Sequence, residues 1–145
     1  MLPTVMKILL DNEFCVLSTC RNDSPNSSLM QYVLNESCTK LYMLTLKEST
    51  KHINIINNPK VSLLIDTRES LYNEANQIKA VTVYGNASII DHRKTMEEII
   101  RQLVKKHTNL IAFASNNKVC VIEVCMDHFL LLDGVDKSFH LDWHC

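Results

Sequence analysis

A short polar cluster, Ser49-Thr50-Lys51, stands between a strand-like run that ends at Thr45 and an apolar segment that stops at Pro59. Ser and Thr are common helix caps, because their side-chain oxygen accepts a hydrogen bond from a free backbone N–H. The first turn of a helix also carries free N–H groups and a partial positive charge. Hydroxyls, amides and an ammonium gathered at one helix start are groups that bind a phosphate.

Lys51 is the unusual member of this cluster, because a cation in the first turn of a helix opposes the helix dipole. Local conflicts of this kind tend to fall at functional sites. Residue types alone leave two interpretations open. Lys51 is either a surface lysine beside an ordinary helix cap, or part of a site for an anionic group.

No other motif for phosphate binding or hydrolysis accompanies the cluster. The chain has only two glycines, Gly85 and Gly134, and therefore lacks a glycine-rich phosphate loop. The G-x-S-x-G and H-E-x-x-H patterns are also absent. A phosphate would have to be held by side chains and by a helix start.

The six cysteines lack the spacing of a metal clip. Cys15 and Cys20 are five residues apart, as are Cys120 and Cys125, and an odd offset places strand residues on opposite faces. We therefore expect reduced, buried cysteines. The terminal HLDWHC contains metal-ligating residue types at 140, 144 and 145, but chain ends are usually loosely held, and we predict no metal site.

Size and composition fit one soluble domain over residues 1–145. The chain is 46% hydrophobic and 21% charged with a net charge of −1, which favours a buried core and gives no bulk attraction for nucleic acid or an anionic membrane. The apolar runs are too short to span a bilayer. The N-terminal MLPTVMKILL has no charged leader, so we expect a cytoplasmic protein.

The elements that must position the cluster are mostly short strands. Alternating patterns and turn residues predict strands at 14–20, 27–34, 40–45, 60–66, 78–90, 118–126 and 128–133. Gly85 inside the long strand predicts a bulge or a close backbone approach. Consecutive strands of this kind predict an α+β fold built on an antiparallel barrel of about six to seven strands with covering helices.

Three helices are expected to cover this barrel. Helical spacing predicts one from Leu2 to Leu10, a short one that starts at the polar cluster and ends before Pro59, and a longer one at 92–106. Residues 67–77 have no clear period, so we expect a loop or a frayed helical turn there.

The segment MLTLKESTKHINIINNPKVSLLID (residues 43–66) resembles the flavin-binding split barrels of the pyridoxamine 5′-phosphate oxidase family. In that family a strand ending in Thr leads through a Ser-containing loop to an Arg-Lys or Thr-Lys pair, a helix and Asn-Asn-Pro. SPNSSLMQYV and AVTVYGNASII resemble the family's second strand and its long strand with a mid-strand glycine. The resemblance covers most of residues 10–130.

This resemblance implies that the ligand is FMN. Lys51 and Thr50 would bind its phosphate, supported by Ser49 and Thr45. Backbone groups of the second strand would run along the ring and the ribityl chain, and the residues involved would be Ser28, Leu29, Met30 and Gln31.

The resemblance also implies a homodimer with the flavin at its two-fold interface. Candidate contacts from the second subunit are Ala80 and Val81 on the long strand and Trp143 in the tail. Trp143 is alternatively a plug on the barrel, which is the interpretation we favour.

Departures from the full oxidase argue against vitamin B6 oxidation. The oxidase has an arginine near the position of Ser28, a glutamine near that of Ala80 and a C-terminal Arg-x-His, all missing here. The chain is more similar to the small general-stress and nitroimidazole-resistance relatives. We therefore expect an FMN-dependent oxidoreductase that moves electrons or hydride between a nicotinamide donor and a small acceptor, with no catalytic side chain identified.

Two alternatives remain open at this point. One is a non-catalytic flavin-binding module that senses stress or redox state. The other is a haem-binding split barrel, in which His128 or His140 would ligate the iron.

Overall fold

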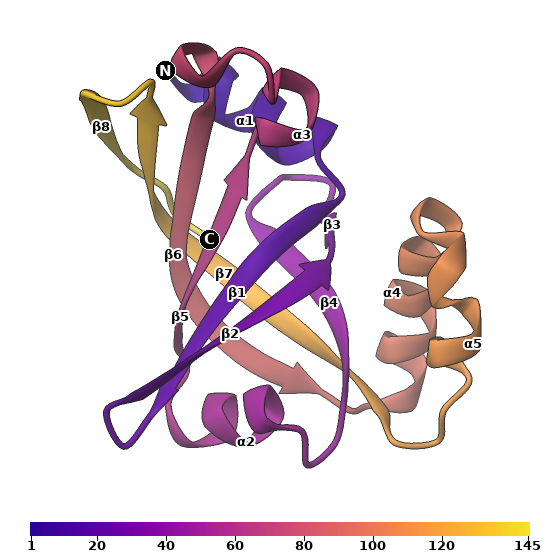
Figure 1. Cartoon of the computed structure of the whole chain (residues 1–145). Coiled ribbons are helices and arrows are strands. Elements are labelled where there is room, and N and C mark those ends of the chain that lie inside the picture. Colours follow the sequence, from indigo (N-terminus) through magenta and orange to yellow (C-terminus); the bar gives the residue numbers. More distant parts are fainter.

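The protein is described by a computed structural model of residues 1–145, in which the strands form one curled antiparallel sheet (Figure 1). The sheet order is β2-β1-β5-β6-β7-β4-β3, and β8 pairs with β7. The strands are β1 (Phe14–Arg21), β2 (Ser24–Gln31), β3 (Val33–Leu34), β4 (Lys40–Leu46), β5 (Lys60–Asp66), β6 (Lys79–Ile90), β7 (Val119–Asp133) and β8 (Lys137–Asp142).

Helices cover the ends and one side of this sheet. They are α1 (Leu2–Asp11), α2 (Thr50–Asn57), α3 (Arg68–Leu71), α4 (Arg93–Lys106) and α5 (Ile111–Ala114), with 3₁₀ turns η1 (Ala75–Gln77) and η2 (Thr108–Leu110). In Figure 1, α1 lies at one end of the barrel, α2 at the other, and α4 with α5 stands beside β4. No helix is both long enough and apolar enough to cross a bilayer.

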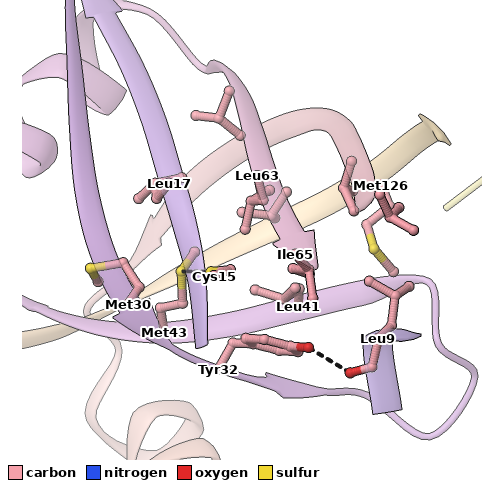
Figure 2. Close-up of a cluster of buried hydrophobic side chains, with 14 of the residues drawn as sticks. Leu9, Cys15, Leu17, Met30, Tyr32, Leu41, Met43, Leu63, Ile65 and Met126 are labelled. Atoms are coloured by element: carbon pink, nitrogen blue, oxygen red, sulfur yellow. Dashed lines mark hydrogen bonds between the residues drawn. The ribbon is translucent and has the colours of Figure 1, made fainter. Parts of the chain in front are cut away.

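The sheet curls because β2 and β3 are consecutive in the chain but lie at opposite ends of the strand order. Only Tyr32 separates them, so the two edges must come together. Tyr32 is fully buried, and its hydroxyl donates a hydrogen bond to the Leu9 carbonyl of α1 over 2.6 Å (Figure 2). The predicted α+β antiparallel barrel is confirmed, with β3 and β8 completing the sheet.

The core lies inside the curl and is closed at one end by α1. Buried residues alternate with more exposed ones along β1 and β5, and Leu17, Met43 and Leu63 belong to one buried cluster with Leu9 of α1 (Figure 2). A second, smaller cluster lies beneath α4, where Ile99 and Leu103 pack against residues of β4 and β7. Burial of these apolar faces is the main term that stabilises the barrel.

Gly85 marks a break in the β6–β7 ladder, as expected. The register shifts between Tyr84 and Gly85, and a Cβ at Gly85 would lie 2.3 Å from the Cys125 carbonyl oxygen. The predicted bulge with a close backbone approach is therefore confirmed.

Two predictions about the C-terminal third are wrong. The strands predicted at 118–126 and 128–133 are one strand, β7, because β6 pairs with it on both sides of Asp127. The chain end is not loosely held either. Residues 137–142 form β8, and a disulfide joins Cys125 to Cys145, so these two cysteines are not reduced.

Other local expectations agree with the structure. The predicted helices at 2–10 and 92–106 correspond to α1 and α4. The segment 67–77 contains α3 and η1, two short helical turns. Cys15 and Cys120 are free and buried, as expected, whereas Cys20 and Cys38 are free but only half-buried.

Candidate functional site

The helix start at Ser49 is fastened to the end of β4 by side-chain hydroxyls. Ser49 is the N-cap of α2, and its Oγ accepts a hydrogen bond from the His52 N–H over 3.3 Å. The same Oγ lies 2.9 Å from Oγ1 of Thr45, which is only 2% exposed. Thr45 and Ser49 therefore fix the strand end and the helix start relative to each other, and Ser49 caps the helix as the sequence predicts.

The body of α2 is anchored so that its first turn stays in place. The Asn54 side chain donates to the Thr19 hydroxyl of β1 over 3.0 Å, and Ile55 packs into the barrel core. The Asn58 N–H closes the helix on the Asn54 carbonyl over 2.7 Å, directly before Pro59. Both ends of the helix are thus set by residues that the sequence reveals.

Lys51 is a half-buried lysine without a counter-charge in the chain. Lys40 and Lys79 are also half-buried, and each pairs with a carboxylate, Glu123 at 3.2 Å and Asp133 at 3.5 Å. The Lys51 ammonium makes no ion pair. A half-buried ammonium beside a helix N-terminus is a strong local attraction for an anion.

Lys51 opens onto a pocket of about 280 Å³ between β2, β4, α2 and the segment 108–114. Its walls are mostly apolar, and Gln31, Thr45 and Lys51 supply the polar side chains. The lining residues are Phe14, Leu29, Met30, Gln31, Leu44, Thr45, Lys51, Leu110 and Phe113. Apolar walls with a few convergent polar groups are typical of a cofactor site, and such sites usually measure about 300–1,000 Å³.

The structure brings most of the predicted binding residues to this pocket. Leu29, Met30, Gln31, Thr45 and Lys51 line it. Ser49 contacts Thr45 through the pair of hydroxyls described above. Neither Ser28 nor Thr50 lines the pocket.

Ser28 and Thr50 directly precede the lining residues Leu29 and Lys51 in the chain. Ser28 is half-buried on β2, where its hydroxyl accepts a hydrogen bond from the Asn26 side chain over 3.4 Å. Thr50 is the exposed first residue of α2.

The residues predicted to touch a flavin from a second subunit lie elsewhere. Val81 is fully buried in the core of its own chain, so its side chain is not available to a partner. Ala80 is half-buried at the next position of β6. Trp143 packs against Phe129, and its indole N–H donates to the Cys38 carbonyl over 3.1 Å, which agrees with a plug on the barrel.

Four lining residues were not identified from the sequence, namely Phe14, Leu44, Leu110 and Phe113. Leu110 and Phe113 belong to the short turns that follow α4, a segment without a periodic pattern. Both belong to the apolar run LIAFA at 110–114, and this run is the only sequence signal for them. Phe113 is 39% exposed at the pocket.

A hydrogen-bonded group links this connection to the end of β2. The side chains of Gln31 and Asn109 pair through two hydrogen bonds of 3.0 and 2.8 Å. Gln31 Nε2 also lies 3.4 Å from Nδ1 of His107, whose Nε2 is 2.8 Å from the Tyr32 carbonyl oxygen. His107 is 2% exposed, so the segment 107–113 is held over the pocket by a buried ring.

None of the four free cysteines lines the pocket. Burial raises the pKa of the Cys15 thiol to about 12, and it also raises the pKa of Cys120. A thiol with a raised pKa stays protonated near neutral pH and is a poor nucleophile. Redox chemistry here would therefore depend on a bound group rather than on these cysteines.

A mostly apolar, partly exposed row of residues crosses the outer face of the sheet next to the pocket. Leu29, which lines the pocket, is 69% exposed, and it begins a row of residues that face one another across five strands. The row consists of Leu29, Val16, Leu64, Thr82 and Leu130. Exposed apolar surface that is continuous with a pocket is typical of an interaction surface.

Two comparisons with known sequences find the same family. A family model described as pyridoxamine 5′-phosphate oxidase matches residues 1–124. A Schizosaccharomyces pombe protein named as a pyridoxamine 5′-phosphate oxidase homologue is 29% identical over 133 residues, covering 72% of this chain and 67% of the relative.

Solved structures show the same fold. General Stress Protein 26 from Bacillus anthracis has a TM-score of 0.69 and 24% identity, covering 96% of this chain and 97% of its own. A FAD-binding protein from Mesorhizobium loti has a TM-score of 0.73 and 14% identity (coverage 90% and 93%). The haem storage protein HutZ from Vibrio cholerae has a TM-score of 0.72 and 16% identity (coverage 94% and 92%).

Proposed function

The chain belongs to the pyridoxamine 5′-phosphate oxidase family, and on that premise we propose that it binds FMN in the pocket between β2, β4, α2 and the segment 108–114. The observation that carries this proposal is Lys51, a half-buried ammonium with no carboxylate partner that lines an otherwise mostly apolar pocket. The flavin-binding neighbour supports a flavin as the ligand class.

The phosphate end of the proposed site is α2 together with its cap. Lys51 supplies a charge, and the first turn of α2 supplies backbone N–H groups. The exposed hydroxyl of Thr50 stands at the same helix start. One phosphate-binding spot of this kind suits a mononucleotide, which favours FMN over a flavin that carries an adenylate.

The ring end of the proposed site is the apolar part of the pocket. Met30 and Leu44 form its floor from two strands, and Leu110 and Phe113 come from the turns after α4. Aromatic and aliphatic walls suit a flat, largely apolar ring system. The volume of about 280 Å³ is just below the usual range of about 300–1,000 Å³, which favours a site that another surface completes.

We propose that a second copy of this chain completes it. The exposed apolar row that starts at Leu29 borders the pocket, so two copies that bury this face against each other would also enclose the ligand. Ala80, half-buried on β6, is one candidate contact. A homodimer with the flavin at its interface is the arrangement that these features favour.

The reaction that we propose is electron or hydride transfer between a nicotinamide donor and a small acceptor. The bound flavin would supply the redox chemistry, and the chain would supply binding and orientation. This assignment agrees with a pocket that holds no activated thiol. The alternative, a flavin-binding module without turnover, predicts the same binding but no steady oxidation of NADH or NADPH.

Haem is a second candidate ligand, because HutZ shares the fold. Iron would need a free histidine nitrogen at the pocket. His107 is the histidine that contacts a lining residue, and both of its nitrogens have hydrogen-bond partners. His128 stacks on Tyr84, and His140 is exposed on β8, so neither lines the pocket. The donor set therefore favours FMN.

The experiment that tests the proposed function is identification of the ligand that copurifies with the chain. Mass spectrometry should detect FMN, and the absorption spectrum should show a flavin band. FMN added to the ligand-free protein should raise its melting temperature, because a ligand that binds only the folded state stabilises it. A Soret band, or no thermal shift with FMN, would contradict the proposal.

A further inference from the structure

The side-chain amide of Gln31 is held at the pocket in one orientation. It exchanges two hydrogen bonds with Asn109 and contacts His107, and it lines the pocket at the end of β2. An amide has one donor end and one acceptor end, so its orientation decides which of them a ligand meets.

The Tyr32 carbonyl determines this orientation. A carbonyl oxygen can only accept, so the nitrogen 2.8 Å away, Nε2 of His107, must carry the hydrogen and donate it. In a neutral imidazole the other nitrogen, Nδ1, is then an acceptor. Its partner at 3.4 Å must be a donor, which places the Nε2 end of Gln31, and not its oxygen, beside His107.

Asn109 takes up most of the remaining hydrogen-bonding capacity of the Gln31 amide. The second hydrogen of Gln31 Nε2 goes to Asn109 Oδ1 over 3.0 Å, and Gln31 Oε1 accepts from Asn109 Nδ2 over 2.8 Å. A glutamine amide has two hydrogens and two lone pairs on its oxygen. Both hydrogens and one lone pair are therefore used inside the protein, and one lone pair of Oε1 is left.

We infer that Gln31 is a specificity-determining residue that accepts a hydrogen bond from an N–H donor of the ligand, and that His107 and Asn109 position its amide for this role. The inference rests on the proposed function and deepens it, because a flavin ring carries one N–H donor of this kind, at N3. It assigns the Gln31 side chain a role beside the backbone contacts expected of β2.

The first test compares FMN with N3-methyl FMN, which lacks the N3 hydrogen. Dissociation constants are measured by flavin fluorescence with the wild-type chain and with Gln31→Met, which preserves side-chain length. We expect the wild type to prefer FMN by about tenfold, the value of one hydrogen bond of about 1.4 kcal/mol. In Gln31→Met the preference should fall to within about twofold.

Gln102→Met is the matched control, because Gln102 is exposed on α4 and outside the pocket. It should keep the wild-type preference. An equal preference in the wild type and in Gln31→Met would overturn the inference even though FMN binds. Failure of the wild type to bind FMN at all would instead overturn the proposed function, and with it the flavin as the ligand that Gln31 contacts.

The second test examines the positioning residues. Asn109→Ala removes one side of the amide pair at an exposed position, and it should reduce the preference for FMN over N3-methyl FMN by at least about threefold with little loss of stability. Long-range ¹H–¹⁵N NMR of the full chain at pH 8 should show His107 with its hydrogen on Nε2. A hydrogen on Nδ1 would reverse the Gln31 amide and contradict the inference.

Discussion

At the scale of single residues, burial decides which polar groups are available for chemistry. Thr45 and His107 are buried with their hydrogen-bonding atoms paired, whereas Lys51 is half-buried without a carboxylate. An unpaired ammonium costs free energy in a partly buried position, so its retention favours a role in binding. The thiol of Cys15 is the opposite case, a polar group that the fold keeps neutral and inert.

Cys15 gives a prediction for alkaline pH. Burial raises the pKa of its thiol to about 12, and burial also raises the pKa of Tyr32. Above about pH 9 the unfolded chain ionises these groups and the folded chain does not, so the unfolded state binds fewer protons. The free energy of unfolding should therefore fall as the pH rises from about 9 to 12, with Cys15 contributing at most about 1.4 kcal/mol per pH unit.

Urea unfolding at pH 8, 9 and 10 measures this slope. Cys15→Ala should lower stability at pH 8 through the cavity it leaves, but it should make the alkaline decline shallower. Leu17→Ala is the matched control, because it also leaves a core cavity and removes no titratable group. An unchanged slope in Cys15→Ala would show that the thiol does not contribute.

At the scale of elements, local sequence signals set the bounds of α2 but not those of β7. The Ser49 cap and Pro59 act within a few residues, so the helix is readable from the chain alone. Asp127 suggests a turn within β7, yet the strand continues because β6 pairs with it on both sides. That pairing joins residues that are far apart in the sequence, so no local pattern predicts it.

The same limit explains which part of the candidate site the sequence revealed. Thr45, Lys51 and the β2 residues 29–31 follow from motif order, and the structure places them around one pocket, which Ser28 and Thr50 do not line. The segment 107–113 reaches that pocket through Gln31, 78 residues away from Asn109 in the chain. A contact across that separation depends on the closed barrel and leaves no periodic signal.

Gly85 gives a prediction at the scale of the β6–β7 pair. In Gly85→Ala the new Cβ would lie 2.3 Å from the Cys125 carbonyl oxygen, so one strand must shift. We expect a loss of about 1–3 kcal/mol in the free energy of unfolding, measured by urea denaturation. Ser88→Ala, at an exposed position of the same strand, is the control and should change stability little. Wild-type stability in Gly85→Ala would contradict the close approach of the two strands.

At the scale of the whole molecule, the proposed dimer links the sheet surface to the pocket. Leu64 lies in the middle of the exposed apolar row, between Val16 and Thr82 on the neighbouring strands. A charge placed there should oppose burial of that face against a second copy. We expect light scattering to give a dimer for the wild type and a monomer for Leu64→Glu, with weaker FMN binding in the variant.

Ile56→Glu is the matched control for this experiment. Ile56 is 63% exposed on α2 and outside the apolar row, so the variant should remain dimeric. A wild-type monomer that binds FMN tightly would contradict the dimer. That result would agree with FMN binding, but it would require that a single chain forms the complete pocket.

The central claim, that this pocket binds FMN by its phosphate through Lys51, is tested most directly by titration of FMN into the wild type and Lys51→Ala. The control is Lys60→Ala, an exposed lysine that does not line the pocket. We expect Lys51→Ala to weaken FMN by about 1.5–3 kcal/mol, the value of a charge-assisted hydrogen bond, and to weaken riboflavin, which lacks the phosphate, far less. Equal FMN affinity in the wild type and Lys51→Ala would contradict the claim.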